Sequence, residues 1–505
     1  MSELQRASVF AIVEETTVGE LKAPTSGSDA IPLRSGFSQT SSLEELASDE
    51  LVNDIGATKS LTGLETAEGT HPAYLKHSEV EGQEPETILL YESAFGDKVV
   101  FSTEYDVTAG STAGTASAAA TLVMPVGEGA QFRVGQAVLI KDDTNGYSIR
   151  NIVSISGDIL TLNFNLSAAP ASGVDLGKAI LLRPAASGHP SFSAWAYGAN
   201  GGYIQAIAGC KTSQISYTLT AGQQAEVEFN YVGVETFKNP VNVTATKKYI
   251  DFIDDGGAKT AILTEDIYKS PIAFIEHVVS VMQAVSVDVV TGSYSSVTGK
   301  YTLSTDGTTF QLNWNTGTNT ANSAATLLGD TTAADRTGAT SYVSTSALDL
   351  TFPFTPVYDD AQNLVVKDAE IMIGSFSDNI CRAASEVRIN LGIEQEDVTS
   401  ICAVTGKLET LPTAREVTIE ADLILQRYET HLFDKFINNK DVAVMVNAGQ
   451  NTSAGQWIAG TCFNFYLPQA TLTQHENGGE TVVILTITAK GYISGNRKDC
   501  YQNFI

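Results

Sequence analysis

The sequence predicts a mainly β protein in which two β-sandwich domains, each with a short flanking α-helix, carry an inserted small β-barrel and an inserted α+β module. Three observations support this prediction. Apolar and polar residues alternate in long runs, as in 226–231 and 415–425, which is the period of a sheet with one covered face. Turn residues such as Asn-Gly and Gly-Asp separate these runs. A phrase that predicts a strand and then a helix occurs twice, ending at 86–98 and at 429–441.

Length and composition limit the possible classes of protein. A chain of 505 residues is too long for one hydrophobic core, so we expect three or four compact units. Its 43% hydrophobic content excludes bulk disorder, and no apolar run reaches the ~18–20 residues that span a bilayer. The first residues lack the basic start of a signal peptide. Five scattered cysteines without a CxxC pair indicate reduced, mostly buried thiols in a protein made in a cytosol: Cys210, Cys381, Cys402, Cys462 and Cys500.

The chain is strongly acidic. Its 58 acidic residues exceed its 30 basic residues and give a net charge of −28. Nothing resembles the basic stripe that neutralises phosphates, so the chain should repel nucleic acid rather than hold it. The acidity is also compatible with a role in solubility alone.

The N-terminal third contains an expected arm and most of the first sandwich. Residues 1–36 are rich in Thr, Ser, Gly and Pro and are predicted to form an extended arm. The first sandwich is assigned to 37–104 and 186–240. Between 84 and 96, Pro85 suits the first turn of a helix and Gly96 occupies the position after its end.

Two further units are predicted as insertions. Residues 105–185 contain short β-rich runs split by tight turns, which indicate a small β-barrel. Residues 241–345 combine a helix that begins near Pro271 with three strands and a short second helix, a combination typical of an α+β module.

Residues 346–505 are predicted to form the second sandwich. The alternating strand 415–425 is followed by a short helix with apolar Leu432, Phe433, Phe436 and Ile437. A final hairpin is expected to turn at Asn477-Gly478.

The repeated phrase predicts an internal duplication. Leu-Glu-Thr triplets at 64–66 and 408–410 precede the two helix phrases, with 21 residues from Glu65 to Glu86 and 20 from Glu409 to Glu429. After each helix the chain continues with a strand, a glycine turn and a long alternating strand. A duplicated domain is useful where a ring needs an even number of similar positions from fewer chains.

The same residues resemble a known family. The segments EETTVGELKAPTSGSDAIPLRSGFSQT and GLETAEGTHPAYLKHSEVEGQEPETILLYESAFG are similar to the N-terminal half of bacteriophage major tail tube proteins, of the siphophage type with two tube domains per subunit and trimeric rings. REVTIEADLILQRYETHLFDKFINN and LPQATLTQHENGGETVVILTITAKGY resemble the second tube domain, and YSSVTGKYTLSTDGTTFQLNWNTG resembles a module inserted in phage structural proteins. The resemblance covers about two-thirds of the chain.

The resemblance implies a virion protein whose inner sheets join across subunits into a tube that conducts DNA. It implies self-association into stacked, pseudo-hexameric homotrimers. It further implies contacts with tail terminator, tape-measure and baseplate or tip proteins, and transient non-specific passage of double-stranded DNA. The location would be the virion tail, assembled in the host cytoplasm, without membrane insertion. A virion decoration or adhesion protein built of β-domains is the alternative, and a carbohydrate-active enzyme is a third, weaker one.

No residue is assigned a catalytic, cofactor-binding or metal-binding role, and we expect no enzyme activity. The six histidines show no HExxH or Cys/His spacing, and Asp254-Asp255 and Asp359-Asp360 do not continue as a calcium loop. GSYSSVTGK (292–300) is predicted to be a hairpin turn rather than a phosphate loop. The three tryptophans are expected to anchor cores. The histidines are His71, His77, His189, His277, His431 and His475, and the tryptophans are Trp195, Trp314 and Trp457.

Overall fold

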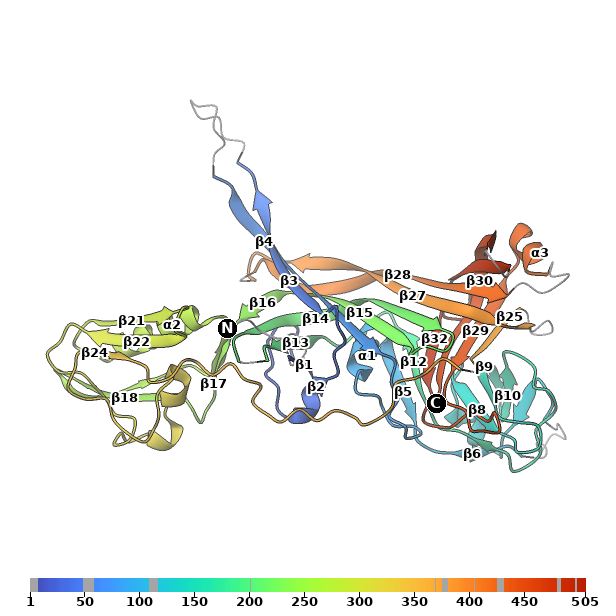
Figure 1. Cartoon of the computed structure of the whole chain (residues 1–505), viewed down its shortest axis with the longest axis horizontal. Helices are drawn as coiled ribbons and strands as arrows, with labels where there is room; N and C mark the ends of the chain where they lie inside the picture. Colours follow the sequence, from blue (N-terminus) through green and yellow to red (C-terminus); the bar gives the residue numbers. More distant parts are fainter. Residues whose placement is uncertain are drawn as a thin grey trace.

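The computed structural model is mainly β, as the alternating sequence predicts (Figure 1). It describes residues 8–48, 59–108, 117–199, 201–367, 369–374, 380–403, 405–424, 431–478, 483–495 and 497–505.

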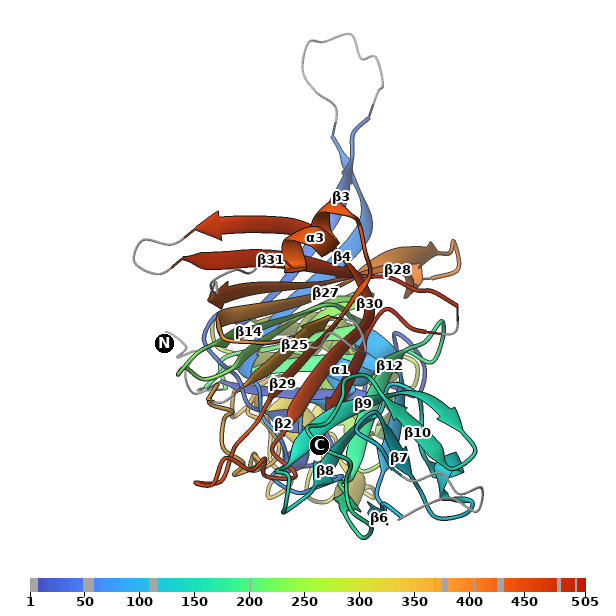
Figure 2. The same cartoon turned by 90° about the vertical axis from the view of Figure 1, so that its right-hand side faces the viewer.

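Eight long antiparallel strands form a sheet that curves as a half-barrel (Figures 1 and 2). Because apolar and polar residues alternate along most of these strands, one face is buried and the other is open to solvent, whereas β3 is largely exposed on both faces. In spatial order the strands are β3 (Ser38–Leu46), β4 (Leu61–Tyr74), β15 (Glu226–Gly233), β14 (Ile204–Thr220), β27 (Ala384–Thr399), β28 (Lys407–Ile424), β31 (Ile484–Gly491) and β30 (Phe463–Gly478).

A second layer covers the buried face. The long strands β14 and β30 connect the layers, since the first part of each pairs with the second layer and the later part with the half-barrel. The second layer contains β1 (Val9–Glu14), β2 (Ala30–Ile31), β5 (Gly96–Phe101), β12 (Ala179–Pro184), β13 (Phe192–Tyr197), β16 (Glu235–Lys238), β25 (Glu370–Gly374), β26 (Ile380–Arg382), β29 (Val442–Ala448) and β32 (Tyr501–Phe504).

Two helices lie over the core between the layers. Helix α1 (Ile88–Phe95) ends where Gly96 adopts a left-handed conformation with φ of 83°, as the glycine predicts. Helix α3 (His431–Ile437) contacts β30. One continuous apolar core unites both halves of the chain and includes Phe229 and Leu432.

The same connectivity occurs twice in the chain. In the first half, apart from β5, β12 and the strands between them, the order along the sequence is β1, β2, β3, β4, α1, β13, β14, β15, β16, and in the second half it is β25 to β28, α3, β29 to β32. The strand pairings match one for one: β1–β2, β1–β13, β13–β14, β14–β15, β15–β4, β3–β4 and β14–β16 against β25–β26, β25–β29, β29–β30, β30–β31, β31–β28, β27–β28 and β30–β32.

A shared bulge fixes which residues correspond. The pairing of β14 with β15 shifts between Thr212 and Gln214, and the pairing of β30 with β31 shifts between Leu472 and Gln474. Gln214 therefore corresponds to Gln474.

The register corrects one detail of the sequence comparison. When the paired residues are followed outward from this bulge, Glu65 corresponds to Arg415 and not to Glu409. The two Leu-Glu-Thr triplets thus lie in equivalent strands but at different positions along them. Spacing along the chain does not determine strand register.

The N-terminal segment differs from the predicted arm. Phe10, Ala11, Ile12 and Val13 are buried in β1, which pairs with both β13 and β2. The short apolar run VFAIV is therefore a core strand, and the polar residues after it form the loop that returns to β2.

The segment 105–185 forms a separate sheet except at its end. Six strands, β6 (Tyr105–Asp106), β7 (Thr121–Val123), β8 (Ala137–Lys141), β9 (Ser148–Ser156), β10 (Ile159–Leu162) and β11 (Asp175–Leu176), enclose their own core. The run 179–184, assigned by sequence to the small barrel, is β12 of the second layer, where it pairs with β5 and β32.

Although this small barrel follows strands of the first half, it packs on the second half through a buried amide network. The side-chain amide of Asn151 donates to Asn464 at 2.8 Å, and Asn464 donates to Asn447 at 2.7 Å. Asn503 donates to Asn464 at 3.1 Å. All four side chains are fully buried and hydrogen-bonded to one another, so this network fixes how the small barrel packs on the second half.

Residues 241–345 form a unit at the opposite end of the molecule (Figure 1). Helix α2 (Pro271–Gln283) begins at the expected proline, and Ser270 caps it by accepting from the Ala273 amide at 3.2 Å. The short second helix is a 3-10 turn at Ala325–Leu328. The strands are β17 (Val241–Val243), β18 (Tyr249–Asp254), β19 (Gly257–Ile262), β20 (Asp266–Tyr268), β21 (Val290–Ser295), β22 (Lys300–Thr305), β23 (Gln311–Leu312) and β24 (Ser341–Val343).

The prediction of a turn at Asn477-Gly478 is wrong. Asn477 pairs with Leu485 and Gly478 with Ile484, so both residues belong to β30 and the connection lies beyond them, outside the described residues.

Candidate assembly interface

The uncovered face of the half-barrel is polar and acidic. Its rows of paired residues consist mainly of Ser, Thr, Asn, Gln and Glu, as in the row Glu226, Thr218, Arg388, Glu420, Thr488. Acidic side chains of this face are Glu68, Glu226, Glu228, Glu386, Glu416, Glu420, Asp422 and Glu476.

The two strand-borne basic residues of this face are held by carboxylates. Arg388 contacts Glu386 at 2.5 Å and Glu420 at 2.6 Å, and Lys490 contacts Glu416 at 2.9 Å. With their charges matched locally, the described strands of this face offer phosphate groups little attraction.

One edge of the half-barrel is open at β30. Residues 471–478 pair with β31 on one side, and no described strand pairs with them on the other. The corresponding part of β14, Gln214–Thr218, has both sides paired, with β15 and with β27.

The opposite edge is open at β3. Residues 38–46 pair with β4 and with no other described strand, whereas the corresponding β27 pairs with both β28 and β14. Leu43, Leu46 and Leu61 of this β3–β4 hairpin are 56%, 47% and 66% exposed. The hairpin projects from the body (Figure 1). An open edge with exposed leucines is a site for pairing with another chain.

Helix α3 carries exposed apolar side chains beside the open edge. Phe433 is 43% exposed and Ile437 is 59% exposed. Phe433 also contacts His475 of β30, with 5.2 Å between ring centroids. In α1, by contrast, Tyr91 is buried against Phe504 from the second half.

The residues tested for chemistry have structural environments. His71 stacks on Phe10 at 4.6 Å, and His77 lies 5.4 Å from Phe504. Burial lowers the pKa of both histidines to about 3, so they are neutral. Asp254 accepts hydrogen bonds from Ser286 at 2.8 Å and the Val287 amide at 3.0 Å, which makes it a loop carboxylate.

Metal spacing, the hairpin turn and the tryptophans were also compared with the structure. Across the part of the chain that the structure describes, no three His, Cys, Asp or Glu residues are grouped to hold a metal ion. Residues 296–299 connect β21 to β22 as the predicted hairpin turn. The tryptophans at 195, 314 and 457 are buried in three separate cores, as expected.

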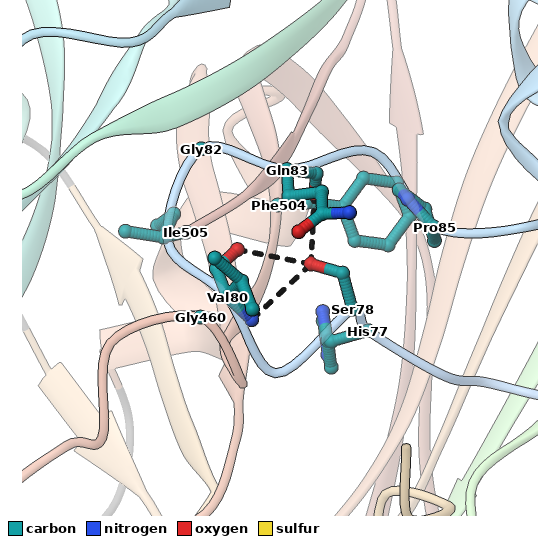
Figure 3. A pocket seen from close by; sticks show the side chains of 9 residues that line it. All are labelled: His77, Ser78, Val80, Gly82, Gln83, Pro85, Gly460, Phe504 and Ile505. Atoms are coloured by element: carbon teal, nitrogen blue, oxygen red, sulfur yellow. Dashed lines mark hydrogen bonds between the residues drawn. The ribbon is translucent and has the colours of Figure 1, made fainter. Parts of the chain in front are cut away.

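A small pocket lies where the chain end meets the loop after β4 (Figure 3). Its volume of about 10 Å³ suits a single water molecule. Ser78 crosses it to contact the carbonyls of Val80 and Gln83, both at 2.9 Å, as the dashed lines show. The pocket is too small for a substrate.

No family model matches the chain, and no curated protein sequence matches it. Among the described residues, the helices are all too short or too polar to span a lipid bilayer. The open edges and the uncovered face are therefore the features on which a function is argued.

The sequence did not identify the open edges. The residues 38–46, SQTSSLEEL, are polar on both faces and give no alternation from which a strand edge can be recognised.

Proposed function

We propose that the protein is the major tail tube subunit of a long, non-contractile bacteriophage tail. Copies join edge to edge into rings, and stacked rings form the conduit through which double-stranded DNA passes. It acts as a structural virion protein rather than an enzyme.

The observation that carries this proposal is that the four-stranded unit occurs twice, and that the two copies have one edge paired with each other and the other edge open. The two four-stranded units share one connectivity and join through β14 and β27. The matching outer edges, β30 and β3, are open within one chain. The pairing that β14 makes with β27 inside the chain can therefore be repeated between β30 of one copy and β3 of the next. Such a heterologous contact generates a ring or a helical filament.

The charge pattern supports a conduit. If the uncovered face lines the lumen, DNA meets carboxylates, hydroxyls and amides, while Arg388 and Lys490 are already ion-paired. Strong phosphate binding needs cationic contacts, so this surface lets DNA slide.

The architecture that we propose has two tube domains, formed by residues 37–104 with 186–240 and by 346–505, with β1, β2 and β12 added to the first. Three copies would form a pseudo-hexameric ring. The α+β module 241–345 would stand outside the tube, and its bulk would obstruct a contractile sheath. Tail terminator, tape-measure and baseplate or tip proteins would contact the assembled tube in the virion.

Electron microscopy of the purified protein tests the proposal. Rings or tubes with a central hole are expected. Dispersed monomers at high concentration would contradict it and favour the alternative, a virion decoration or adhesion protein.

A further inference from the structure

We infer that the groove beside β3 receives strand β30 of a second copy, in the register that β14 takes on β27, with Lys238 as the residue that recognises it. This inference rests on the proposed function, because it names the surfaces that join within the ring.

The internal junction supplies the register. Asn390 pairs with Ser216 and Gly392 with Gln214. The bulge in β14 and β30 equates Ser216 with Glu476, and the paired strands equate Asn390 with Thr40. Transferred to the open edges, the pairs between copies are Ser38 with Gly478, Gln39 with Asn477, Thr40 with Glu476, Ser41 with His475 and Ser42 with Gln474.

These pairs are chemically compatible. None places two carboxylates or two cations opposite each other, an arrangement that would destabilise the contact. A shift by one residue would turn Gln474 and Glu476 of β30 from the uncovered face toward the core, which disfavours the shifted register.

A groove lies beside the open edge of β3. It has a volume of about 360 Å³ and is lined by Phe37, Ser38 and Gln39 of the edge and by Tyr203, Gln205 and Lys238 of the second layer, together with Ser8 and Ala196. Lys238 Nζ lies 4.6 Å from the centre of the Tyr203 ring, which holds the ammonium group in the groove.

The second half shows how the equivalent groove is filled. Gln502 corresponds to Lys238, because Gln502 pairs through β32 with Phe465 as Lys238 pairs through β16 with Gln205. Gln502 accepts a hydrogen bond from Tyr217 of β14 at 2.5 Å, which crosses the junction between the halves. The residue of β30 that corresponds to Tyr217 is Asn477. Lys238 would thus donate to the side-chain carbonyl of Asn477 from the next copy.

The exposed apolar side chains provide a second, independent argument. Leu43 on β3 is 56% exposed, while its counterpart Ile393 on β27 is 7% exposed because the first half covers it. Placed on β30 of a second copy, Leu43 would approach α3 and its exposed Phe433. Both residues would then leave water.

Disulfide trapping tests the register. The exposed Cys402 is first replaced by serine, together with Cys381, while the buried Cys210, Cys462 and Cys500 are kept. Thr40→Cys with Glu476→Cys then places two thiols directly opposite on the uncovered face. The matched control combines Ser42→Cys with Glu476→Cys, which is on the same face but two residues out of register. Opposite Cβ atoms lie about 4.5–5.5 Å apart and diagonal ones about 7–8 Å, so only the first pair should bond efficiently.

The expected result is a ladder of linked copies for the first pair, at least about tenfold stronger than for the control. Equal or stronger linkage in the control, or linkage by Glu476→Cys alone, would overturn the register. Rings in the microscope without linkage in either variant would overturn it while leaving the proposed function intact. An absence of rings would contradict both the register and the proposed function.

A second pair of variants tests Lys238. Lys238→Gln keeps a donor and should assemble like the unmodified protein, whereas Lys238→Glu should raise the concentration needed for half-assembly at least about tenfold. Equal assembly by both folded variants would overturn the role given to Lys238.

Discussion

Two adjacent residues of α3 should have opposite roles, and replacing each with alanine separates folding from assembly. Leu432 is fully buried in the main core, whereas Phe433 is 43% exposed. A helix as short as α3 has little stability of its own, so the packing of Leu432 holds it in place. Leu432→Ala should lower the free energy of unfolding by about 2–5 kcal/mol.

The effect of Phe433→Ala should appear in assembly. A phenylalanine buries roughly 200 Å² when fully covered, so a 43% exposed ring still leaves about 90 Å² to be buried by a second copy. At about 25 cal/mol per Å², that contact contributes about 2 kcal/mol. The concentration at half-assembly should therefore rise about 30-fold.

Urea unfolding followed by tryptophan fluorescence measures the first effect, and light scattering against concentration measures the second. Phe433→Ala should cost about 1 kcal/mol or less in the unassembled chain. Unfolding of Phe433→Ala to the same extent as Leu432→Ala would show that the helix face is misassigned. Unchanged assembly of a folded Phe433→Ala protein would show that α3 lies outside the interface.

Three further predictions concern the single chain. Asn464→Leu should lower the free energy of unfolding by about 3 kcal/mol or more in urea, because it leaves the buried amides of Asn151, Asn447 and Asn503 short of partners; an unchanged midpoint would contradict the network. Because the pKa of His71 and of His77 is about 3 when folded and near 6.5 when unfolded, stability should be full above pH 6.5 and fall by about 1.4 kcal/mol per pH unit and histidine between pH 6.5 and 3. A variant with His77→Phe should lose about half of that pH dependence, and an identical slope would refute its assignment. Gly69→Ala should destabilise the fold, since its Cβ would lie 2.1 Å from the Tyr231 ring, whereas Gly392→Ala, with its nearest contact at 3.8 Å, should be tolerated; thermal unfolding of both variants compares them, and equal melting temperatures would refute the close packing.

Local patterns of the sequence were sufficient for the elements with strong signals. Gly96 ended α1 because glycine tolerates the left-handed backbone that closes a helix, and Pro271 began α2 because its fixed φ suits the first turn. The alternation in 226–231 and 415–425 identified strands with one buried face because period two needs no knowledge of partners.

Partners between distant segments could not be predicted in this way. The run 179–184 joins β5 and β32, and VFAIV joins β13, by pairings between segments far apart in the chain. Strand composition is alike in a barrel and in a central sheet, so 179–184 was assigned to the barrel, while the polar residues around VFAIV led to its assignment to an arm.

The candidate interface could not be predicted from the sequence for a related reason. An open edge is defined by a missing neighbour, and Ser38–Ser42 has the polar composition of a loop. The duplication was visible in the sequence as an order of elements, while its register required the bulges at Ser213 and Thr473.

The mass of assembled particles tests the central claim most directly. Native mass spectrometry of rings should give three times the 53.6 kDa of one chain, because three copies with two repeated units each would close a six-lobed pore. Only single chains, or dimers that cannot add a third copy, would show that β3 and β30 do not join and would contradict the account.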